Sequence, residues 1–351
     1  MINKPSPLIG AEIKNRWTLV AELSAPDGAT GSNFSRTFKG SDKTNQRDVF
    51  VKIVDIEKAF KIYAGSMPIT ELLEKIAQEH SHESSLAELC GERKMNRVVR
   101  PISSGELIHS SVNLPLPYIV FEWAAEGDTH KIISTDPVCS AKASWWLRTL
   151  HNAAVGIKQL HSVGIAHQDV KPSNLVFFQP YRSKITDLGR AVQKKKKSHN
   201  DDKNGDPNHA PPELYYSVRN PVWETRFLSQ DLYMLGSLAF WFFSGYKSFT
   251  KVLMYEQLDS AYFPSNFRGS FTDVLPILEI NYSRILEELK AHVPPEISED
   301  FVTIIGQLCH PDPNFRGHPR QIQSTLSNQY SLERYITQFI RLAKKLEVYG
   351  K

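Results

Sequence analysis

The chain has 351 residues, of which 41% are hydrophobic and 23% are charged, a composition typical of a globular protein with one large or two ordinary domains. Its net charge of +4 does not by itself indicate nucleic-acid binding, so no specific nucleic-acid partner is expected. The most apolar segment, residues 232–243, is too short to cross a membrane and is expected to form a buried helix.

The cysteines and the N-terminus favour an intracellular setting. The three cysteines are far apart and odd in number, at Cys90, Cys139 and Cys309, which argues against a disulfide framework and for a reducing compartment. The first residues lack the long apolar stretch of a secretory signal. We therefore expect a cytoplasmic protein with no membrane partner.

The first part of the chain alternates short strand-like runs with turns and one helical region. The strand-like runs are rich in branched and aromatic residues, and the helical segments have an apolar period of about 3.6 residues. The predicted strands are 17–23, 49–54, 98–107 and 117–123, and the predicted helical segments are 68–80 and 84–90.

The second part of the chain is predicted to be mostly helical. Residues 145–161 have a helical apolar period, and the long segments after Gln230 are also helical, through 331–347. Residues 246–298 are expected to form a long connection between the apolar helix and the last helices. A β-rich first part followed by a helical second part predicts the α+β class.

Three polar side chains lie within one short loop of the sequence, I165-A-H-Q-D-V-K-P-S-N174. This loop holds a carboxylate at Asp169, an ammonium at Lys171 and a carboxamide at Asn174, and the tripeptide D-L-G begins eighteen residues after Asp169, at Asp187. Phosphoryl transfer needs a group to hold the attacking hydroxyl, a cation for the phosphate and oxygen ligands for magnesium. The spacing therefore indicates a phosphotransferase.

The loop resembles the protein-kinase catalytic loop H-R-D-x-K-x-x-N, and D-L-G resembles the metal-binding D-F-G. The resemblance implies a two-lobed kinase fold, with an N-lobe at 12–124 and a C-lobe at 125–349, that uses ATP and Mg²⁺. It gives Asp169 the role of orienting the substrate hydroxyl, Lys171 that of stabilising phosphate charge, and Asn174 and Asp187 that of holding the metal. His167 becomes a structural residue of the loop, and the lysine at 171 goes with Ser/Thr specificity.

The resemblance also implies a nucleotide-binding lysine and a glutamate partner. Lys52, in V49-F-V-K52, resembles the V-A-I-K lysine that contacts the α- and β-phosphates. Its partner on the following helix is predicted to be Glu83, because Leu86, Ala87 and Cys90 then fall on one face with it. Glu79 and Glu88 remain alternatives.

Two further segments are expected to contact the nucleotide. In F121-E-W-A-A125, the backbone of Glu122 and Ala124 would bond the adenine edge, with Phe121 beside it. The phosphate-binding loop would lie between the first two strands, near Gly31 and Ser32, but the segment lacks the glycine pattern G-x-G-x-x-G.

Three downstream elements resemble architectural motifs of protein kinases. Glu213 ends a P-P-E in place of A-P-E, Asp231 begins the apolar helix and would brace the catalytic loop, and Arg316 in D-P-N-F-R would pair with Glu213. Small-molecule kinases with a similar catalytic loop generally lack these elements. A protein substrate is therefore favoured, and a small-molecule kinase is the less favoured alternative.

Three departures from the family pattern bear on activity. Gln168 replaces the arginine that normally grips a phosphorylated loop, and Ser198 is the single hydroxyl residue between Gly189 and Glu213, so activation by loop phosphorylation is not expected. Phe50 stands where the family has an alanine above the adenine, on the same face of the strand as Lys52. Phe50 keeps a second interpretation open, that of a pseudokinase acting as a binding module.

The run 194–197 of four lysines fits either a solvated loop or a docking point for an acidic partner.

Overall fold

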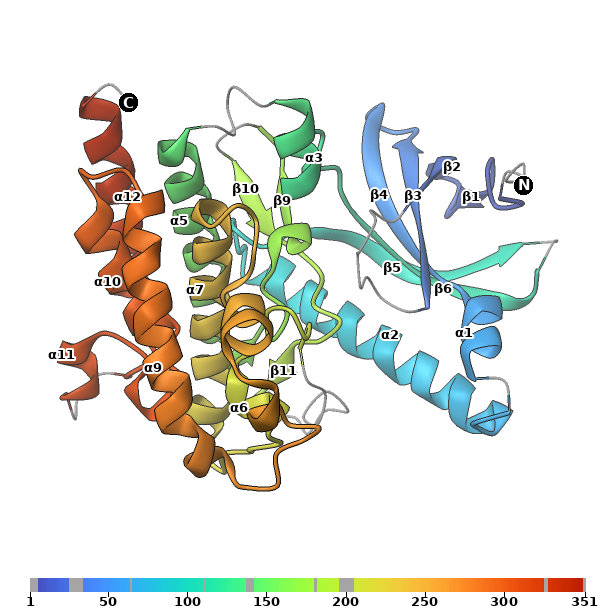
Figure 1. Ribbon diagram of the computed structural model, residues 1–351. Coiled ribbons are helices and arrows are strands. Elements are labelled where there is room, and N and C mark those ends of the chain that lie inside the picture. Colours follow the sequence, from blue (N-terminus) through green and yellow to red (C-terminus); the bar gives the residue numbers. More distant parts are fainter. Residues whose placement is uncertain are drawn as a thin grey trace. The chain divides into compact units, whose positions relative to one another are not determined.

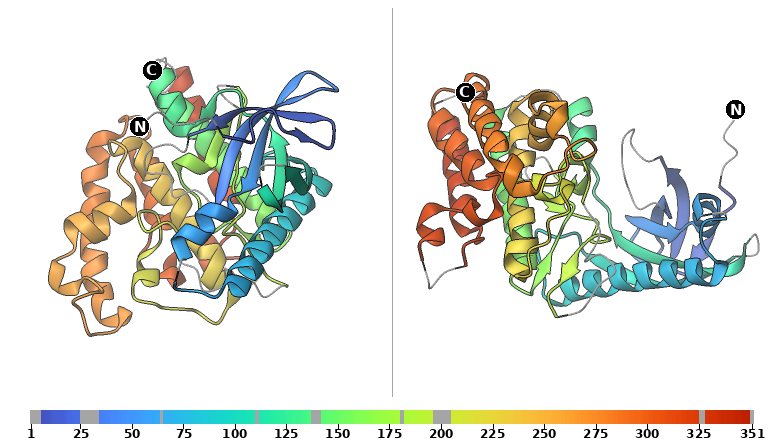
Figure 2. Two further views of the ribbon diagram at one scale, coloured as in Figure 1. Left: turned by 90° about the vertical axis from the view of Figure 1, so that its right-hand side faces the viewer. Right: turned by 60° about the horizontal axis from the view of Figure 1, so that its bottom comes forward.

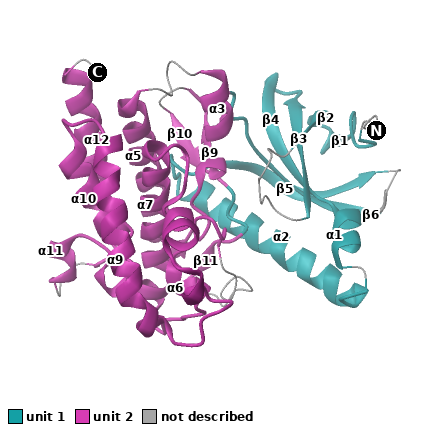
Figure 3. Ribbon diagram, in the orientation of Figure 1, with its two compact units in different colours: residues 1–125, 187–189 teal, residues 126–186, 190–351 magenta. Residues whose placement is uncertain are grey.

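The computed structural model describes residues 6–24, 34–63, 65–109, 112–136, 142–179, 182–195, 205–324 and 328–349 (Figure 1). The chain divides into two compact units, coloured separately in Figure 3. Unit 1 comprises residues 1–125 and 187–189, and unit 2 comprises residues 126–186 and 190–351. The prediction of a β-rich first part and a helical second part is confirmed.

Unit 1 is built on one antiparallel sheet of six strands in the order β1-β2-β3-β4-β6-β5. The strands are β1 (Glu12–Ile13), β2 (Trp17–Leu23), β3 (Ser35–Asp42), β4 (Arg47–Val54), β5 (Pro101–His109) and β6 (Val112–Glu122). Alternate residues along a strand point to opposite faces, and Val49, Val51 and Ile53 of β4 are all buried in the core under the sheet.

The described residues of unit 1 form two helices, α1 (Ile56–Tyr63) and α2 (Ile69–Glu92). The two helical segments predicted at 68–80 and 84–90 are one continuous helix, α2, which packs against β5 and β6 (Figure 2). Residues 79–83 of this helix are all polar, and among them only Glu83 is buried. The polar run interrupts the apolar period without interrupting the helix, because backbone hydrogen bonds carry it across.

The second unit is mainly helical. Its α-helices are α3 (Thr129–Thr135), α5 (Ala143–His161), α6 (Pro212–Tyr215), α7 (Ser229–Phe243), α8 (Phe249–Lys251), α9 (Phe271–Leu289), α10 (Ser298–Leu308), α11 (Pro319–Ile322) and α12 (Glu333–Val348). Shorter helical turns are η1 (Pro172–Asn174), η3 (Glu224–Leu228), η4 (Val252–Gln257), η5 (Ser260–Tyr262), η6 (Lys290–His292) and η7 (Pro313–Phe315).

Helix α7 is the centre of unit 2. All 15 of its residues are buried, as its almost uninterrupted apolar sequence predicts. Both α5 and α10 pack against it, and α12 packs against α5, as the views in Figures 1 and 2 show. Two ion pairs join α5 to α12, Arg148–Glu347 and Lys158–Glu333. None of the described helices is both long enough and apolar enough to cross a membrane.

Two small antiparallel sheets hold the loops of unit 2. One has the order β10-β9-β7, and the other pairs β11 with β8. Their strands are β7 (Gly127–Asp128), β8 (Ile165–Ala166), β9 (Leu175–Phe177), β10 (Ser183–Ile185) and β11 (Val192–Gln193). The loop between β8 and β9 carries Asp169, Lys171 and Asn174, so both of its ends are fixed by strand pairing.

The prediction of a long connection over residues 246–298 is wrong in part, because much of this segment is helix. Helix α9 begins with a capping box, in which the Ser270 side chain accepts from the Asp273 N–H and the Asp273 side chain accepts from the Ser270 N–H. Pro276 lies inside the helix, where a proline removes a backbone hydrogen bond. Burial of Val274, Leu278, Ile285 and Leu289 on one face offsets that loss.

Candidate active site

Lys52 of unit 1 is held between two carboxylates. Its Nζ lies 2.7 and 2.8 Å from the two oxygens of Glu83 and 3.4 Å from Oδ1 of Asp187. Strand β4 supplies the lysine and α2 supplies Glu83, while Asp187 has a left-handed backbone, with a φ of 64°. Burial disfavours the ammonium, but the Asp187 and Glu83 carboxylates outweigh that effect and raise the pKa of Lys52. Lys52 therefore stays charged.

The position of each glutamate along α2 decides which one can reach Lys52. The structure brings Glu83 to Lys52, and the residue is buried, with 8% of its surface exposed. Glu88 is on the exposed surface and accepts a hydrogen bond of 2.7 Å from the Ser104 hydroxyl on β5. Glu88 is therefore not the partner of Lys52 in this structure.

Phe50 lies on the same face of β4 as Lys52, opposite the buried valines. It pairs with Phe121 across β4 and β6, and the centroids of the two rings are 6.4 Å apart. The two phenyl groups thus cover this part of the sheet next to Lys52. A phenyl group here takes up space that an alanine would leave open.

The other residues predicted to contact a nucleotide are placed only in part. The backbone N–H of Glu122 donates to the carbonyl of Arg100 at 3.1 Å, and the Glu122 carboxylate accepts from the Arg100 N–H at 2.7 Å. The Glu122 N–H is therefore already bonded to Arg100. Ala124 follows the end of β6 in irregular backbone. Gly31 and Ser32 lie outside the described residues.

In unit 2, Asp231 of α7 binds the backbone of the catalytic loop. Its two carboxylate oxygens accept from the N–H of His167 at 2.7 Å and of Gln168 at 2.8 Å, and His161 contacts it at 2.8 Å. Burial disfavours the carboxylate, but these hydrogen bonds and the histidines lower the pKa of Asp231 overall. The Asp231 carboxylate is therefore charged and holds the loop to α7.

Gln168 is bonded inward. Its backbone is left-handed, with a φ of 62°, and its side-chain amide donates to the Phe227 carbonyl at 2.9 Å and to Asp231 at 3.0 Å. The next turn is closed by His167, whose Nδ1 accepts from the N–H of Asp169 at 3.2 Å and whose Nε2 contacts the Thr186 carbonyl at 3.0 Å. These bonds fix the backbone on both sides of the loop aspartate.

Asp169, Lys171 and Asn174 form one buried cluster. One carboxylate oxygen of Asp169 lies 3.0 Å from Nζ of Lys171 and accepts from the Asn174 amide at 2.9 Å. The same amide donates to the Asp169 carbonyl at 2.8 Å. The other carboxylate oxygen, Oδ1, is buried and has no hydrogen-bond partner among the described residues. This oxygen is available to a substrate hydroxyl.

Two residues of this cluster were missed by the sequence analysis. Asp206 lies 3.2 Å from Nζ of Lys171, so the lysine sits between two carboxylates. His209 is buried near them, and burial lowers its pKa to about 4. Both belong to the segment 205–213 that resembles the end of an activation segment, and that was the available signal.

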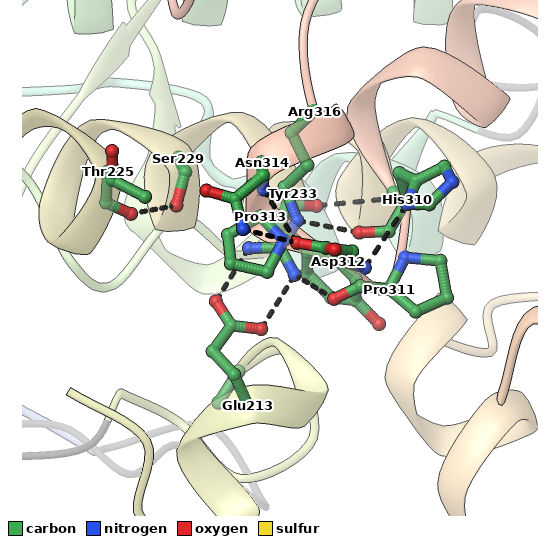
Figure 4. A network of polar contacts seen from close by, with 12 residues as sticks. Glu213, Thr225, Ser229, Tyr233, His310, Pro311, Asp312, Pro313, Asn314 and Arg316 are labelled. Carbon is green, nitrogen blue, oxygen red and sulfur yellow. Dashed lines mark hydrogen bonds and ion pairs between the residues drawn. The ribbon is translucent and has the colours of Figure 1, made fainter. Parts of the chain in front are cut away.

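Glu213 and Arg316 make a buried bidentate ion pair, with both N–O distances 2.6 Å (Figure 4). Arg316 is fully buried and also donates to the carbonyls of His310 at 2.7 Å and Pro311 at 2.9 Å. Its guanidinium lies 4.8 Å from the centre of the Tyr233 ring of α7. The pair therefore ties α6, α7 and the η7 loop together within unit 2.

Each unit carries an oxygen group of the kind that magnesium prefers. Mg²⁺ prefers hard oxygen ligands, takes few from the protein and keeps the rest from water and phosphates. In unit 2, the Asn174 side-chain nitrogen donates to Asp169, and the same side chain carries a hard carbonyl oxygen. In unit 1, Asp187 carries a carboxylate. Within the described ranges, no group of three or more His, Cys, Asp or Glu is arranged to hold a metal alone.

Comparison with known proteins identifies a family. The model of the protein kinase domain matches residues 30–327. Human serine/threonine-protein kinase H1 is 30% identical over 184 residues, which is 49% of this chain and 41% of that protein. CBL-interacting protein kinase 26 of Oryza sativa subsp. japonica is 24% identical over 256 residues, or 69% of this chain and 45% of that protein.

Yeast serine/threonine-protein kinase GIN4, from Saccharomyces cerevisiae, is 29% identical over 112 residues, which cover 30% of this chain and 10% of that protein. The chain thus spans less than half the length of these three relatives. The family match, in contrast, covers most of the chain and includes both the Lys52 cluster and the Asp169 cluster. The chain belongs to the protein kinase domain family.

Proposed function

We propose that the protein is an active Ser/Thr protein kinase that transfers the γ-phosphoryl group of ATP to protein substrates. The observation that carries this proposal is the state of Asp169. One carboxylate oxygen is held by Lys171 and Asn174, and the other is buried without a partner among the described residues. A buried, unpaired acceptor is costly, and a substrate hydroxyl would satisfy it.

The residues divide the work of phosphoryl transfer. Asp169 orients the attacking hydroxyl and accepts its proton as the new oxygen–phosphorus bond forms and the bond to the leaving diphosphate breaks. Lys171 and Lys52 offset negative charge on the phosphates. Asn174 and Asp187 would hold magnesium, which supplies further positive charge to the phosphates. Glu83 keeps Lys52 oriented through its two short hydrogen bonds.

The second candidate function is that of a pseudokinase, and Phe50 is the observation that favours it. Its ring lies beside Phe121 on the face of β4 that also carries Lys52. A phenyl group in place of alanine reduces the room for an adenine. Against this reading, Lys52 keeps its pairing with both Glu83 and Asp187.

A third reading, a small-molecule kinase, is disfavoured by the Glu213–Arg316 pair, which resembles an architectural contact of protein kinases. We also propose a cytoplasmic location, from the three scattered cysteines, of which Cys90 and Cys309 are free and buried. No specific nucleic-acid partner is proposed.

The test is ATP turnover with magnesium and generic basic and acidic protein substrates, with Asp169→Asn as the matched variant. Asparagine keeps the size of the side chain and removes its ability to take the proton. Transfer to serine or threonine that is lost in Asp169→Asn would establish the activity. If no transfer is observed and ATP gives no thermal shift, the pseudokinase reading replaces the proposal.

A further inference from the structure

In unit 2, the backbone at the start of the segment 205–213 lies directly against the catalytic loop. A β-carbon at Gly205 would lie 2.8 Å from the carbonyl oxygen of Gln168 and 2.7 Å from the terminal methyl of Met234 on α7. A contact that short to a backbone oxygen would force the loop to shift, so glycine is the residue that fits here. The segment is thus seated on the loop that carries Asp169.

Asp206, the next residue, forms a tight turn beside Lys171. Its carbonyl accepts from the N–H groups of His209 at 2.9 Å and Ala210 at 2.8 Å, and its Oδ1 accepts from the N–H of Asn208 at 2.9 Å. Aspartate commonly closes turns in this way. The other carboxylate oxygen, Oδ2, lies 3.2 Å from Nζ of Lys171. The turn therefore fixes the carboxylate that contacts the lysine.

The start of α8 holds the same turn. The hydroxyl of Thr250 donates to the Ala210 carbonyl at 2.9 Å, and the hydroxyl of Ser248 donates to the Asn208 carbonyl. Both hydroxyl residues are buried. These contacts involve neither a phosphate nor an arginine, so the position of Asp206 does not depend on modification of the segment.

Opposite charges join the segment to the catalytic loop at Asp206 and Lys171. Each of these residues is 5% exposed, so water screens their attraction little. The arginine that would grip a phosphorylated segment is replaced by Gln168, whose amide donates to Phe227 and Asp231 instead. The link between segment and loop is therefore a permanent ion pair.

A lysine that offsets phosphate charge has to be held in place, because its four-carbon side chain is flexible. Nζ of Lys171 lies 3.0 Å from Asp169 and 3.2 Å from Asp206, so two carboxylates at nearly equal distance hold the ammonium. The Asp169 oxygen in this contact also accepts from the Asn174 amide. An ammonium that is in place before the phosphate arrives needs no reorganisation as charge develops during the reaction.

We propose that Asp206 is a positioning residue for phosphoryl transfer, which holds the Lys171 ammonium beside Asp169 without phosphorylation of the segment. The inference rests on the proposed kinase activity and adds to it a residue that acts through Lys171. In this role the Asp206 carboxylate fixes the cation that offsets the charge of the transferred phosphate. It also ties the segment to the catalytic loop by a charge that is always present.

The test is Asp206→Asn in the full chain, because asparagine keeps the oxygen that closes the turn and removes the charge. The kcat should fall about tenfold or more, the loss of one charge-assisted hydrogen bond, whereas the KM for ATP should stay within about twofold. The matched control is Asp259→Asn. Asp259 is exposed and closes a similar turn by accepting from the Ala261 N–H at 2.8 Å, so this variant should keep the wild-type kcat.

A double-mutant cycle shows whether Asp206 acts through Lys171. In the Lys171→Met background there is no ammonium to hold, so adding Asp206→Asn should change the residual kcat less than about twofold. A role confined to the turn would instead add its full loss in that background. Such an additive loss overturns the proposal, and so does an unchanged or raised kcat in Asp206→Asn alone.

Acetylation of lysines by a succinimidyl ester, read by mass spectrometry, tests the contact without any phosphoryl transfer. Losing the carboxylate frees the ammonium, so Lys171 should be acetylated at least about tenfold faster in Asp206→Asn than in the wild type, and at the wild-type rate in Asp259→Asn. If the wild type transfers no phosphate, the kinase activity fails, and the acetylation rate still decides whether Asp206 holds Lys171. An unchanged rate overturns that contact.

Discussion

Replacing Arg316 with methionine should strongly destabilise unit 2. The change leaves Glu213 buried and charged without a partner, a situation that costs about 3–5 kcal/mol. It also leaves the carbonyls of His310 and Pro311 without the guanidinium donor that they have now, at about 1 kcal/mol each. The expected loss of stability is therefore about 5–7 kcal/mol.

A double-mutant cycle separates the ion pair from the other contacts. Glu213→Leu combined with Arg316→Met removes both charges, so the double variant should recover about 3 kcal/mol or more of the loss. Hydrogen exchange of the α7 amides, over Ser229–Phe243, would report the local stability, because Tyr233 of this helix lies under the guanidinium. Urea unfolding followed by tryptophan fluorescence would report the global effect.

The outcome that refutes this reasoning is additivity. If the double variant is as unstable as the sum of the two single variants, the pair contributes nothing beyond its members. A loss below about 1 kcal/mol for Arg316→Met would also refute it, because that is the range of exposed pairs. A conservative Arg316→Lys variant keeps the charge and loses the bidentate geometry, so it should fall between wild type and methionine.

Four further predictions concern pH, nucleotide binding, the catalytic loop and Ser198. Because burial lowers the pKa of His209 to about 4 while an unfolded chain takes up the proton near 6.5, stability should fall by up to about 3 kcal/mol as the pH drops from 6.5 to 4, and His209→Phe should flatten that part of the denaturation profile. Phe50→Ala should increase the ATP-dependent thermal shift by opening the face beside Lys52; an unchanged or smaller shift would show that the ring does not restrict the nucleotide. Asp231→Asn should speed hydrogen exchange at His167 and Gln168, and unaltered exchange would mean that the carboxylate does not hold the loop. Activity should survive Ser198→Ala, with no phosphate found on the segment by mass spectrometry, whereas a large loss would mean that loop phosphorylation activates the protein after all.

The fold could be predicted where one kind of residue dominates a segment. The apolar run at 232–243 predicted a buried helix because no other environment suits it, and α7 covers it. The prediction of a long connection over residues 246–298 was wrong in part because Pro276 and several polar residues interrupt the apolar pattern of α9 in the sequence. The prediction of two separate helical segments, 68–80 and 84–90, was wrong because apolar periodicity reports which residues pack against a neighbour. Backbone hydrogen bonds continue the helix through residues that do not pack.

The candidate site was readable where its chemistry is local in sequence. Asp169, Lys171 and Asn174 lie within six residues and contact one another directly. The contact between Lys171 and Asp206 joins residues 35 positions apart, and no spacing rule identifies it. Glu83 could be proposed but not separated from Glu79 and Glu88 on the sequence alone, because the outcome depends on which turn of α2 meets β4.

The complete burial of α7 has a consequence for synthesis of the chain on the ribosome. Among the described elements that pack against α7, α5 and η3 precede it and α8 follows it closely, whereas α10 is made more than fifty residues later. Until then, one flank of an apolar helix has no cover, and exposed apolar surface of this kind promotes aggregation and recruits chaperones. We expect premature termination between α7 and α10 to yield insoluble or chaperone-bound fragments.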